Sequence, residues 1–216
     1  MKEMGIPGII LAAGPGTRFS LPMYKLLMPF RGKTILNGVV KTALVSELES
    51  VWVVIGHEKE MIWKALYSLP PSKRLHIIEN PDYLKGRASS LRCGFEAVPK
   101  PIEHTMSLLG DQPLVTPELI NELIDAVAKN PDASLFFPLK DGKKGNPIVY
   151  SQLLFDELIS IEGDKSGFEV VEKYFDKAHK LVLKDSTSQL NVNTYEDYLE
   201  LLKHEACSEK REGKAI

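Results

Sequence analysis

The sequence predicts an α/β fold in which helices cover both faces of a mostly parallel β-sheet. Short apolar runs alternate with longer amphipathic stretches along most of the chain, as in repeated strand–helix units. The 216 residues suit one α/β domain better than two, and they can bury a substantial core. We expect this domain to cover residues 1–205, with residues 206–216 as a polar tail.

Six short apolar runs predict the strands of this sheet. They lie at residues 8–13, 51–55, 75–78, 105–109, 133–137 and near 180–184. Helices are predicted at 34–46, 58–68, 87–97 and 117–129, then near 151–160 and 166–177, and finally from residue 195. Thr116 and Pro117 are typical of a helix start, with a capping hydroxyl before a proline at the first position. Residues 140–146 predict a turn.

The charge balance argues against a polyanionic partner. There are 27 basic and 29 acidic residues, so the formal net charge is −2. Such a balance gives no electrostatic footprint for nucleic acid or for an anionic membrane. The apolar run at residues 9–13 is too short for the core of a signal peptide or for a membrane span, so we expect a cytoplasmic protein.

A glycine loop follows the first predicted strand, in the segment from Leu11 to Phe19. Gly14 and Gly16 allow the backbone to approach phosphate oxygens and to present N–H donors to them. Arg18 and Lys25 add positive charge, the first as a planar fork and the second as a point charge. In α/β folds, ligands bind at the carboxyl ends of the strands. The loop therefore predicts a phosphate site, although a turn without a ligand is the alternative.

Two related phosphate motifs do not fit this segment. A dinucleotide-binding fingerprint requires glycine at position 19, which is Phe19. Gly32, Lys33 and Thr34 match the end of a Walker loop, but its first glycine would fall on Leu27.

Asp111 is a candidate magnesium ligand, because it follows the strand predicted at 105–109 and so lies at the same edge of the sheet. Mg²⁺ takes oxygen ligands and keeps several waters, so one or two protein carboxylates are enough. The alternative is a turn aspartate, since Asp-x-Pro is common in turns. Asn191 and Asn193 alternate along a later extended segment and can reach one polar pocket, with Asn193 as a second candidate metal ligand.

Hydroxyl side chains near two predicted helix starts have structural interpretations. Thr194 and Asp197 form a variant of the capping box before the last helix. Ser89 or Ser90 is expected to cap the helix at 87–97.

Several of these motifs, taken in order, resemble the MobA-like NTP transferase family, whose members link GMP or CMP to molybdopterin. The similar segments are Leu11 to Arg18 with Lys25, Gly86 to Leu91 with Asn80, Gly110 to Pro113, Gly145 to Pro147, and Gly163 with Asp164. The resemblance implies a three-layer α/β/α fold of the nucleotide-diphospho-sugar-transferase (Rossmann-like) type. It also implies Mg²⁺ on Asp111, with the nucleotide on the N-terminal half and the acceptor on the C-terminal half.

The resemblance and the motifs together give a set of expected site residues. The charge-bearing catalytic residues are Arg18, Lys25 and Asp111, and Asn193 joins Asp111 at the metal. The expected nucleotide-binding residues are Leu11, Ala12, Ala13, Gly14, Gly16, Thr17, Arg18, Lys25, Gly86, Ser90 and Gly110. The expected acceptor-binding residues are Gln112, Asn146, Asp164 and Asn191.

The expected reaction is transfer of a nucleoside monophosphate from a nucleoside triphosphate to a phosphorylated acceptor, releasing pyrophosphate. Ala12 and Ala13 resemble the molybdenum cofactor cytidylyltransferase (MocA-like) branch, whereas Asn191 and Asn193 resemble the guanylyl branch. We favour CTP and molybdopterin as substrates, with a molybdoenzyme or its chaperone as a downstream partner. The alternatives are GTP, a sugar phosphate or another phosphorylated acceptor, and a non-catalytic module that binds the nucleotide or cofactor. An NAD domain is a further alternative, against which the missing third glycine counts.

Overall fold

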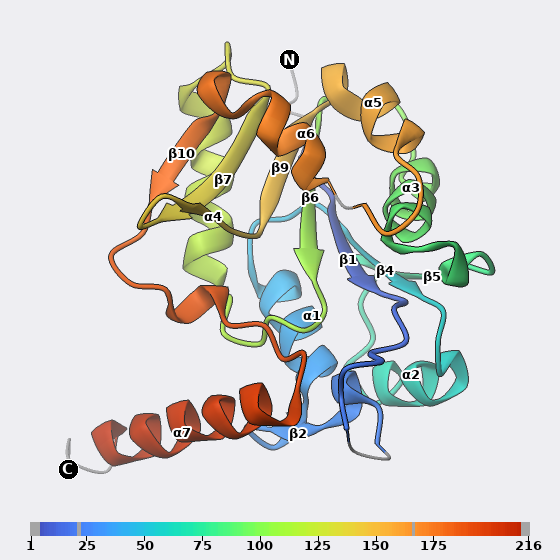
Figure 1. The fold of residues 1–216 in the computed structure, drawn as a ribbon, viewed down its shortest axis with the longest axis vertical. Helices are drawn as coiled ribbons and strands as arrows, with labels where there is room; N and C mark the ends of the chain where they lie inside the picture. Colours follow the sequence, from blue (N-terminus) through green and yellow to red (C-terminus); the bar gives the residue numbers. More distant parts are fainter. Residues whose placement is uncertain (1–4, 21–22, 166, 213–216) are drawn as a thin grey trace.

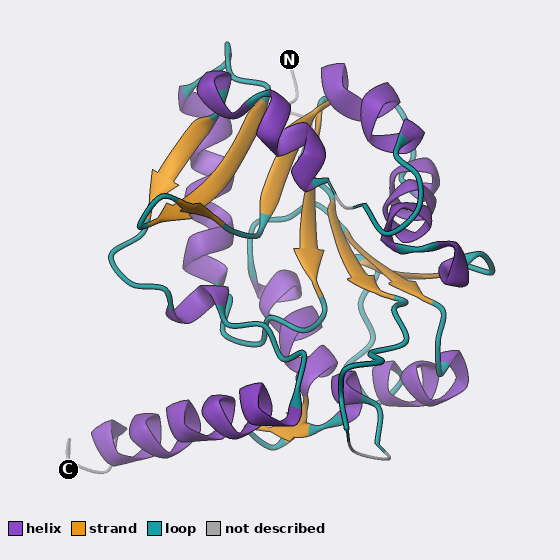
Figure 2. Cartoon of the chain, in the orientation of Figure 1, coloured by secondary structure: helices purple, strands orange, loops and turns teal. Residues whose placement is uncertain are grey.

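The computed structural model describes residues 5–20, 23–165 and 167–212, and the side chains of residues 205–212 are excluded. The chain forms a central sheet with helices on both sides (Figures 1 and 2). Along the sheet, the strand order is β10-β7-β9-β6-β1-β4-β5, and β8 pairs with β7. The strands are β1 (Gly8–Ala12), β4 (Val51–Ile55), β5 (Leu75–Glu79), β6 (His104–Leu109), β7 (Leu135–Lys140), β8 (Lys143–Lys144), β9 (Ile148–Ser151) and β10 (His179–Val182).

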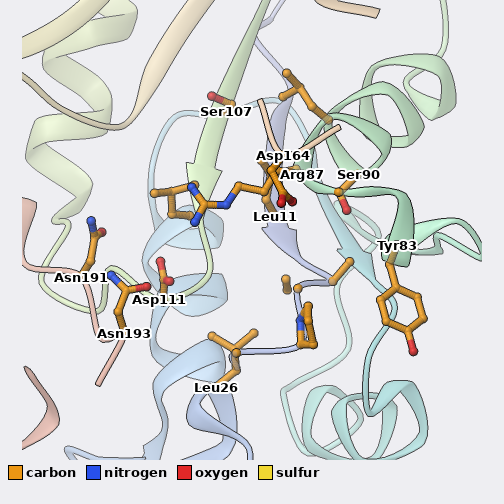
Figure 3. Close-up of a pocket in the computed structure, with 18 of the residues that line it drawn as sticks. Leu11, Leu26, Tyr83, Arg87, Ser90, Ser107, Asp111, Asp164, Asn191 and Asn193 are labelled. Carbon is orange, nitrogen blue, oxygen red and sulfur yellow. The ribbon is translucent and has the colours of Figure 1, made fainter. Parts of the chain in front are cut away.

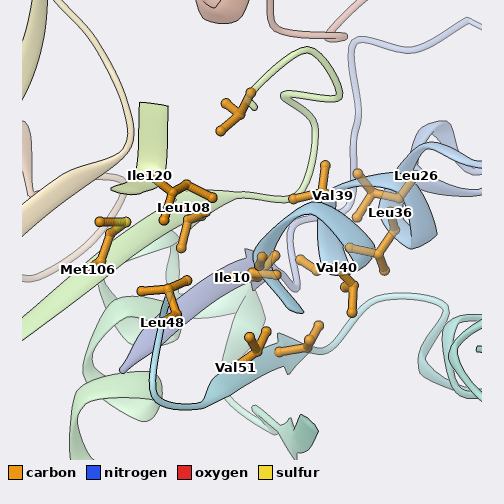
Figure 4. Close-up of a cluster of buried hydrophobic side chains, with 14 of the residues drawn as sticks. Ile10, Leu26, Leu36, Val39, Val40, Leu48, Val51, Met106, Leu108 and Ile120 are labelled. Carbon is orange, nitrogen blue, oxygen red and sulfur yellow. The ribbon is translucent and has the colours of Figure 1, made fainter. Parts of the chain in front are cut away.

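Neighbouring side chains on each strand pack into different cores, which makes the fold three-layered. On one face, residues such as Ile10 and Leu108 pack against α1 (Ile35–Val45), α2 (Lys59–Leu66) and α4 (Pro117–Lys129), as Figure 4 shows in part. On the other face, Ile9 and Val54 pack against α3 (Arg87–Ala97), α5 (Phe155–Ser160) and α6 (Phe168–Lys173). Alternate side chains of a strand point to opposite faces of the sheet, as expected where helices cover both faces. The predicted α/β/α architecture is confirmed.

The six predicted strands are all present, and most of them are parallel. Strand β1 pairs in parallel with β4 and with β6, β4 with β5, and β10 with β7. Strand β9 was not predicted, and it pairs antiparallel with β6 and β7. The helical stretch predicted near 151–160 is confirmed from residue 152, where the 3-10 helix Gln152–Leu154 leads into α5, and only Ser151 belongs to β9 instead. The buried run Ile148–Ser151 is only four residues long and directly follows Asn146 and Pro147, which indicated a loop.

The predicted turn at residues 140–146 and the predicted start of α4 are present, whereas α6 differs in length from its prediction. Asp141 and Gly142 both have positive φ, 49° and 74°, and form the tight hairpin between β7 and β8. Thr116 caps α4 by accepting from the Leu119 N–H, and Pro117 opens the helix, as predicted. Helix α6 is shorter than the predicted 166–177, and residue 166 lies outside the described residues.

Helix α7 (Tyr195–Glu212) extends past the predicted start of the polar tail at residue 206. The segment is rich in Ala, Glu and Lys, which favour helix without needing an apolar periodicity. The first turns of α7 pack through Tyr198 and Leu201 against the hairpin of β2 (Pro29–Phe30) and β3 (Lys33–Thr34). Across the described segments, no helix combines the length and apolarity that a bilayer crossing would need.

Candidate active site

The glycine loop and the segment that carries Asp111 begin at the same edge of the sheet, after neighbouring strands. Leu11 at the end of β1 pairs with Leu109 at the end of β6, so the segments that follow start at the same edge. A pocket of about 720 Å³ lies there and is shown in Figure 3. Its lining includes fifteen of the predicted site residues: Leu11, Ala12, Ala13, Gly14, Gly16, Thr17, Arg18, Lys25, Gly86, Ser90, Asp111, Asn146, Asp164, Asn191 and Asn193.

The four residues with predicted charge and metal roles are in direct contact. The Lys25 Nζ lies 2.5 Å from the Asp111 Oδ2 and donates to the Asn193 Oδ1 at 3.3 Å. The Arg18 guanidinium donates to the same Asn193 oxygen at 2.8 Å. Only 11% of the Lys25 side chain and 19% of the Asp111 side chain is exposed, so both charges are largely shielded from water. The cluster joins residues 175 positions apart in the chain.

The glycine loop is held by a tyrosine that the sequence analysis did not identify. The Tyr24 hydroxyl donates to the Gly14 carbonyl at 2.5 Å, and it lies 3.4 Å from the Ala12 carbonyl. Burial, reinforced by the negative charge of Asp111, raises the pKa of Tyr24 well above its usual value, so the phenol stays protonated as a donor. A Cβ on Gly14 would meet no atom within 4 Å, which leaves the loop open toward the pocket.

A second set of polar groups lies across the pocket, at the start of α3. Asn80 is buried and donates from its Nδ2 to the hydroxyls of Ser89 and Ser90, at 3.0 and 3.1 Å. The expected capping role of these serines is wrong: Gly86 is the N-cap of α3 without a side-chain bond, and the single proton of the Ser89 hydroxyl lies within hydrogen-bond reach of the carbonyls of Gly86 and Asp82. The Ser90 hydroxyl accepts from Asn80 and lines the pocket, so its own proton is left to donate to a ligand.

Two predicted site residues do not line the pocket. Gly110 is a contact between strands instead, because its N–H donates to the Leu11 carbonyl and a Cβ would lie 3.1 Å from that oxygen. Gln112 is 2% exposed, and its Oε1 has no hydrogen-bond partner within the described segments. By contrast, the Asn146 backbone is fixed at the pocket wall by a reciprocal pair of hydrogen bonds with the Gln189 side chain.

The comparison with protein families decides the identity of this fold and site. The sequence model of the MobA-like NTP transferase domain matches residues 8–179. The chain belongs to this family.

Relatives of this MobA-like domain include longer proteins. The bifunctional protein GlmU of Thermosipho africanus (strain TCF52B) is 28% identical over 166 residues, which are 76% of this chain and 34% of that protein. The chain thus spans about a third of the length of the curated relatives it matches.

Solved structures of similar length share the whole fold. Rv0371c from Mycobacterium tuberculosis H37Rv has a TM-score of 0.79 and 26% identity, covering 93% of this chain and 98% of that one. Its complex with manganese has a TM-score of 0.75 and 25% identity, covering 93% and 99%. A nucleotidyl transferase from Methanothermobacter thermautotroptrophicus has a TM-score of 0.79 at 21% identity, covering 93% and 97%, and it shows the fold alone.

The oxygen donors of the cluster fit a hard cation. The Asp111 carboxylate and the Asn193 amide oxygen already converge on one positive group, the Lys25 ammonium. Within the described residues, no three His, Cys, Asp or Glu side chains gather into a metal-binding group. A cation here would therefore need water and substrate phosphates as further ligands, which is the usual habit of Mg²⁺.

The sequence analysis missed several lining residues, among them Tyr24, Tyr83, Arg87 and Ser107. Tyr24 and Arg87 lie next to Lys25 and Gly86 in sequence, and this adjacency was the available signal. Ser107 lies inside β6 and points to the pocket only because of the strand register, which the apolar pattern does not specify.

Proposed function

We propose that this protein is a nucleotidyltransferase that moves CMP from CTP to molybdopterin in the presence of Mg²⁺. The observation that carries the proposal is the convergence of Arg18, Lys25, Asp111 and Asn193 at one wall of the pocket. Membership in the MobA-like family supports the enzyme class, and the GlmU relatives and the manganese complex of Rv0371c are consistent with it. The non-catalytic alternative does not explain why a lysine and a carboxylate are held together at a phosphate loop.

In the proposed reaction, a terminal phosphate oxygen of the acceptor attacks the α-phosphorus of CTP. The new P–O bond forms as the bond between the α-phosphorus and the bridging oxygen breaks, and pyrophosphate leaves with that electron pair. The attacking oxygen is already ionised at neutral pH, so no general base is required. Catalysis then depends on positioning and on neutralisation of charge.

The chain's own groups provide this positioning. The loop at Gly14 and Gly16 presents backbone N–H groups to the triphosphate, and Tyr24 fixes the loop through the Gly14 carbonyl. Arg18 and Lys25 stabilise the charge that develops on the leaving pyrophosphate. Asp111 and Asn193 would hold the Mg²⁺, which supplies positive charge at the α-phosphate when bound.

The base is expected at the opposite end, near Ser90 and Tyr83. Figure 3 shows these two residues across the pocket from Asn191 and Asn193. The asparagines that resemble the guanylyl branch thus lie near Asp111, across the pocket from the site that we propose for the base. Ser90 offers an O–H donor, which suits the O2 and N3 acceptors of cytosine better than the N–H donors on the guanine edge. Ala13 also lines the pocket, and we expect its Cβ to narrow the space that a two-ring base would need.

The test is single-turnover competition between CTP and GTP with Mg²⁺ and molybdopterin. We expect CTP to be favoured in kcat/KM by at least about tenfold, a gap of ~1.4 kcal/mol. Ala13→Gly should narrow that gap, because it opens space at the base. Equal use of both nucleotides, or a preference for GTP, would overturn the cytidylyl assignment.

A broader screen separates the other classes. Thermal unfolding with CTP, GTP, ATP, UTP and NAD, each with Mg²⁺, should show stabilisation of about 2.7 kcal/mol for a ligand at ~100 times its Kd. Stabilisation by NAD alone would indicate a dinucleotide domain. A clear nucleotide effect with no pyrophosphate release from any phosphorylated acceptor would indicate a binding module.

A further inference from the structure

Arg87 is a positively charged residue that lines the pocket and has no role in the proposed reaction. Three residues with positive side chains line the pocket: Arg18, Lys25 and Arg87. Arg18 donates to Asn193, and Lys25 pairs with Asp111. Arg87 makes no hydrogen bond or ion pair with another residue of the described chain, so its guanidinium is free to bind a ligand.

The backbone that carries Arg87 is fixed by close packing. Gly86 has φ +102°, and a Cβ there would lie 2.3 Å from the carbonyl carbon and oxygen of Gly163. The Ala88 N–H also donates to the Gly163 carbonyl at 3.2 Å. The start of α3 is therefore held against the turn that bears Asp164, an expected acceptor-binding residue, and Arg87 leaves the helix from a defined position next to this turn.

The side chain of Arg87 extends into the pocket. Figure 3 shows it reaching from the start of α3 in the direction of the wall that holds Asp111 and Asn193. Arg18, on the glycine loop, and Lys25, at the start of the short 3-10 helix Lys25–Leu27, lie at that wall. The pocket is thus bordered by positive side chains from separate segments of the chain.

In an in-line displacement the leaving group and the attacking group lie on opposite sides of the phosphorus. Arg18 and Lys25 therefore cannot bind the same phosphate as a cation on the attacking side. If the loop, with Arg18 and Lys25, holds the leaving pyrophosphate, the attacking phosphate must approach the α-phosphorus from the opposite side. The predicted acceptor residues that line the pocket, Asn146, Asp164 and Asn191, carry no positive charge, and Asp164 is negative. A phosphate dianion entering there needs a cation.

We propose that the Arg87 guanidinium binds the phosphate group of the acceptor and orients its attacking oxygen. This inference rests on the proposed nucleotidyl transfer, but not on the identity of the base or of the rest of the acceptor. A planar guanidinium suits this task because it can donate two parallel N–H bonds to two phosphate oxygens. The proposal narrows the acceptor to a molecule with a phosphate monoester dianion.

The test uses inorganic phosphate as the probe on the nucleotide-bound protein. The wild type is first saturated with α,β-methylene CTP and Mg²⁺, an analogue that cannot release pyrophosphate, and phosphate is then titrated by calorimetry. We expect saturable phosphate binding that Arg87→Ala weakens about 10- to 100-fold, the scale for losing a hydrogen bond to a charged group. Arg87→Lys should lie between the two, because it keeps the charge and loses the fork.

Lys85→Ala is the matched control, because it removes a positive charge two residues away, from a side chain that pairs with Asp82 and does not line the pocket. It should bind phosphate as the wild type does, and all variants should bind the nucleotide analogue equally. The proposal is overturned if Arg87→Ala binds phosphate normally, or if the wild-type complex shows no saturable phosphate binding. A matching loss of nucleotide binding in Arg87→Ala would place Arg87 on the triphosphate instead.

The design separates this inference from the proposed function. If the GTP analogue binds in place of the CTP analogue, the base assignment fails and the same titration is made on the GTP complex. If neither nucleotide analogue binds to the wild type, nucleotidyl transfer itself is wrong, and the role of Arg87 falls with it.

Discussion

Neutralising Asp111 should cost both activity and stability. Asp111→Asn keeps an oxygen acceptor for Lys25 but removes the charge that lies 2.5 Å from the ammonium. At that distance the gross attraction is about 7 kcal/mol for an effective dielectric constant of ~20. Much of it offsets the desolvation of the two charges. We therefore expect a net loss of about 1–3 kcal/mol in the free energy of unfolding, the scale for a hydrogen bond to a charged group.

Two measurements on the same preparation test this expectation. Urea unfolding should show the loss of stability, which corresponds to about 2–12 °C in Tm for a chain of this size. Pyrophosphate release should fall by more than about 10²-fold, because a neutral amide binds a hard cation more weakly than a carboxylate does and the cluster would lose its carboxylate. Activity near that of the wild type would refute the metal assignment.

A double-mutant cycle isolates the ion pair from other effects of the substitution. Combining Asp111→Asn with Lys25→Met should give a coupling energy of about 1–3 kcal/mol, as expected for groups in direct contact. Asp125 and Lys129 form the control pair, since they lie one helical turn apart on α4 and both side chains are more than 60% exposed. Their coupling should be at most about 0.5 kcal/mol. Equal coupling in both cycles would refute the claim that shielding from water strengthens the Lys25 pair.

Further predictions concern the loop and its charges. Lys25→Ala should slow turnover by roughly 10²–10³-fold, the scale for deleting one preorganised stabilising group. Arg18→Lys should also slow turnover, because the lysine ammonium cannot donate the two parallel N–H bonds of a guanidinium. Full kcat in both variants would show that the loop does not contact the leaving group. Tyr24→Phe should lower the free energy of unfolding by about 0.5–1.5 kcal/mol by removing the bond to the Gly14 carbonyl, and should weaken nucleotide binding in calorimetry. Tyr67→Phe, at a 78% exposed position, should change neither quantity and serves as the control.

The sequence predicted six strands of the sheet because each of them contains a short apolar run between turn residues, whereas β9 was missed. It also predicted that the glycine loop and Asp111 share an edge, because both follow such runs. The contact between Lys25 and Asp111, 86 positions apart, depends on β1 and β6 being direct neighbours. Apolar runs do not specify which strands pair, so the distance could not be predicted from the pattern alone.

The residues that were missed or misplaced share a physical cause. Gln112 lies next to Asp111 in sequence, but its side chain is 2% exposed and does not line the pocket, because the turn after β6 directs it into the interior. Ser90 interacts with Asn80, whose position depends on the end of β5 and not on the helix start that suggested capping. Arg87 lies in the segment from Gly86 to Leu91 but was given no role of its own, and the packing of Gly86 on Gly163 places it at the pocket.

The position of Asn193 follows from a segment that lies beyond the part of the chain matched by the family model. The Val192 N–H donates to the Asp111 carbonyl at 2.9 Å, and the Val192 side chain is fully buried beside Phe19 and Phe30. On the other side, the Asp197 carboxylate accepts from the Asn193 N–H and from the Thr194 N–H, in the predicted capping box. Asn193 is thus anchored from both directions, and its backbone position does not depend on its own side chain.

This anchoring leaves the chemistry of the side chain at position 193 free to set the charge of the cluster. With a neutral amide, the charges of Arg18, Lys25 and Asp111 leave the cluster with one net positive charge. A carboxylate at position 193 would cancel that charge, since it would accept from both Arg18 and Lys25 in place of the amide oxygen. A net positive cluster attracts the triphosphate even before a cation is bound. Under the proposed function, we therefore expect the amide to favour capture of the nucleotide first, with the metal then binding to Asp111 and the phosphates together.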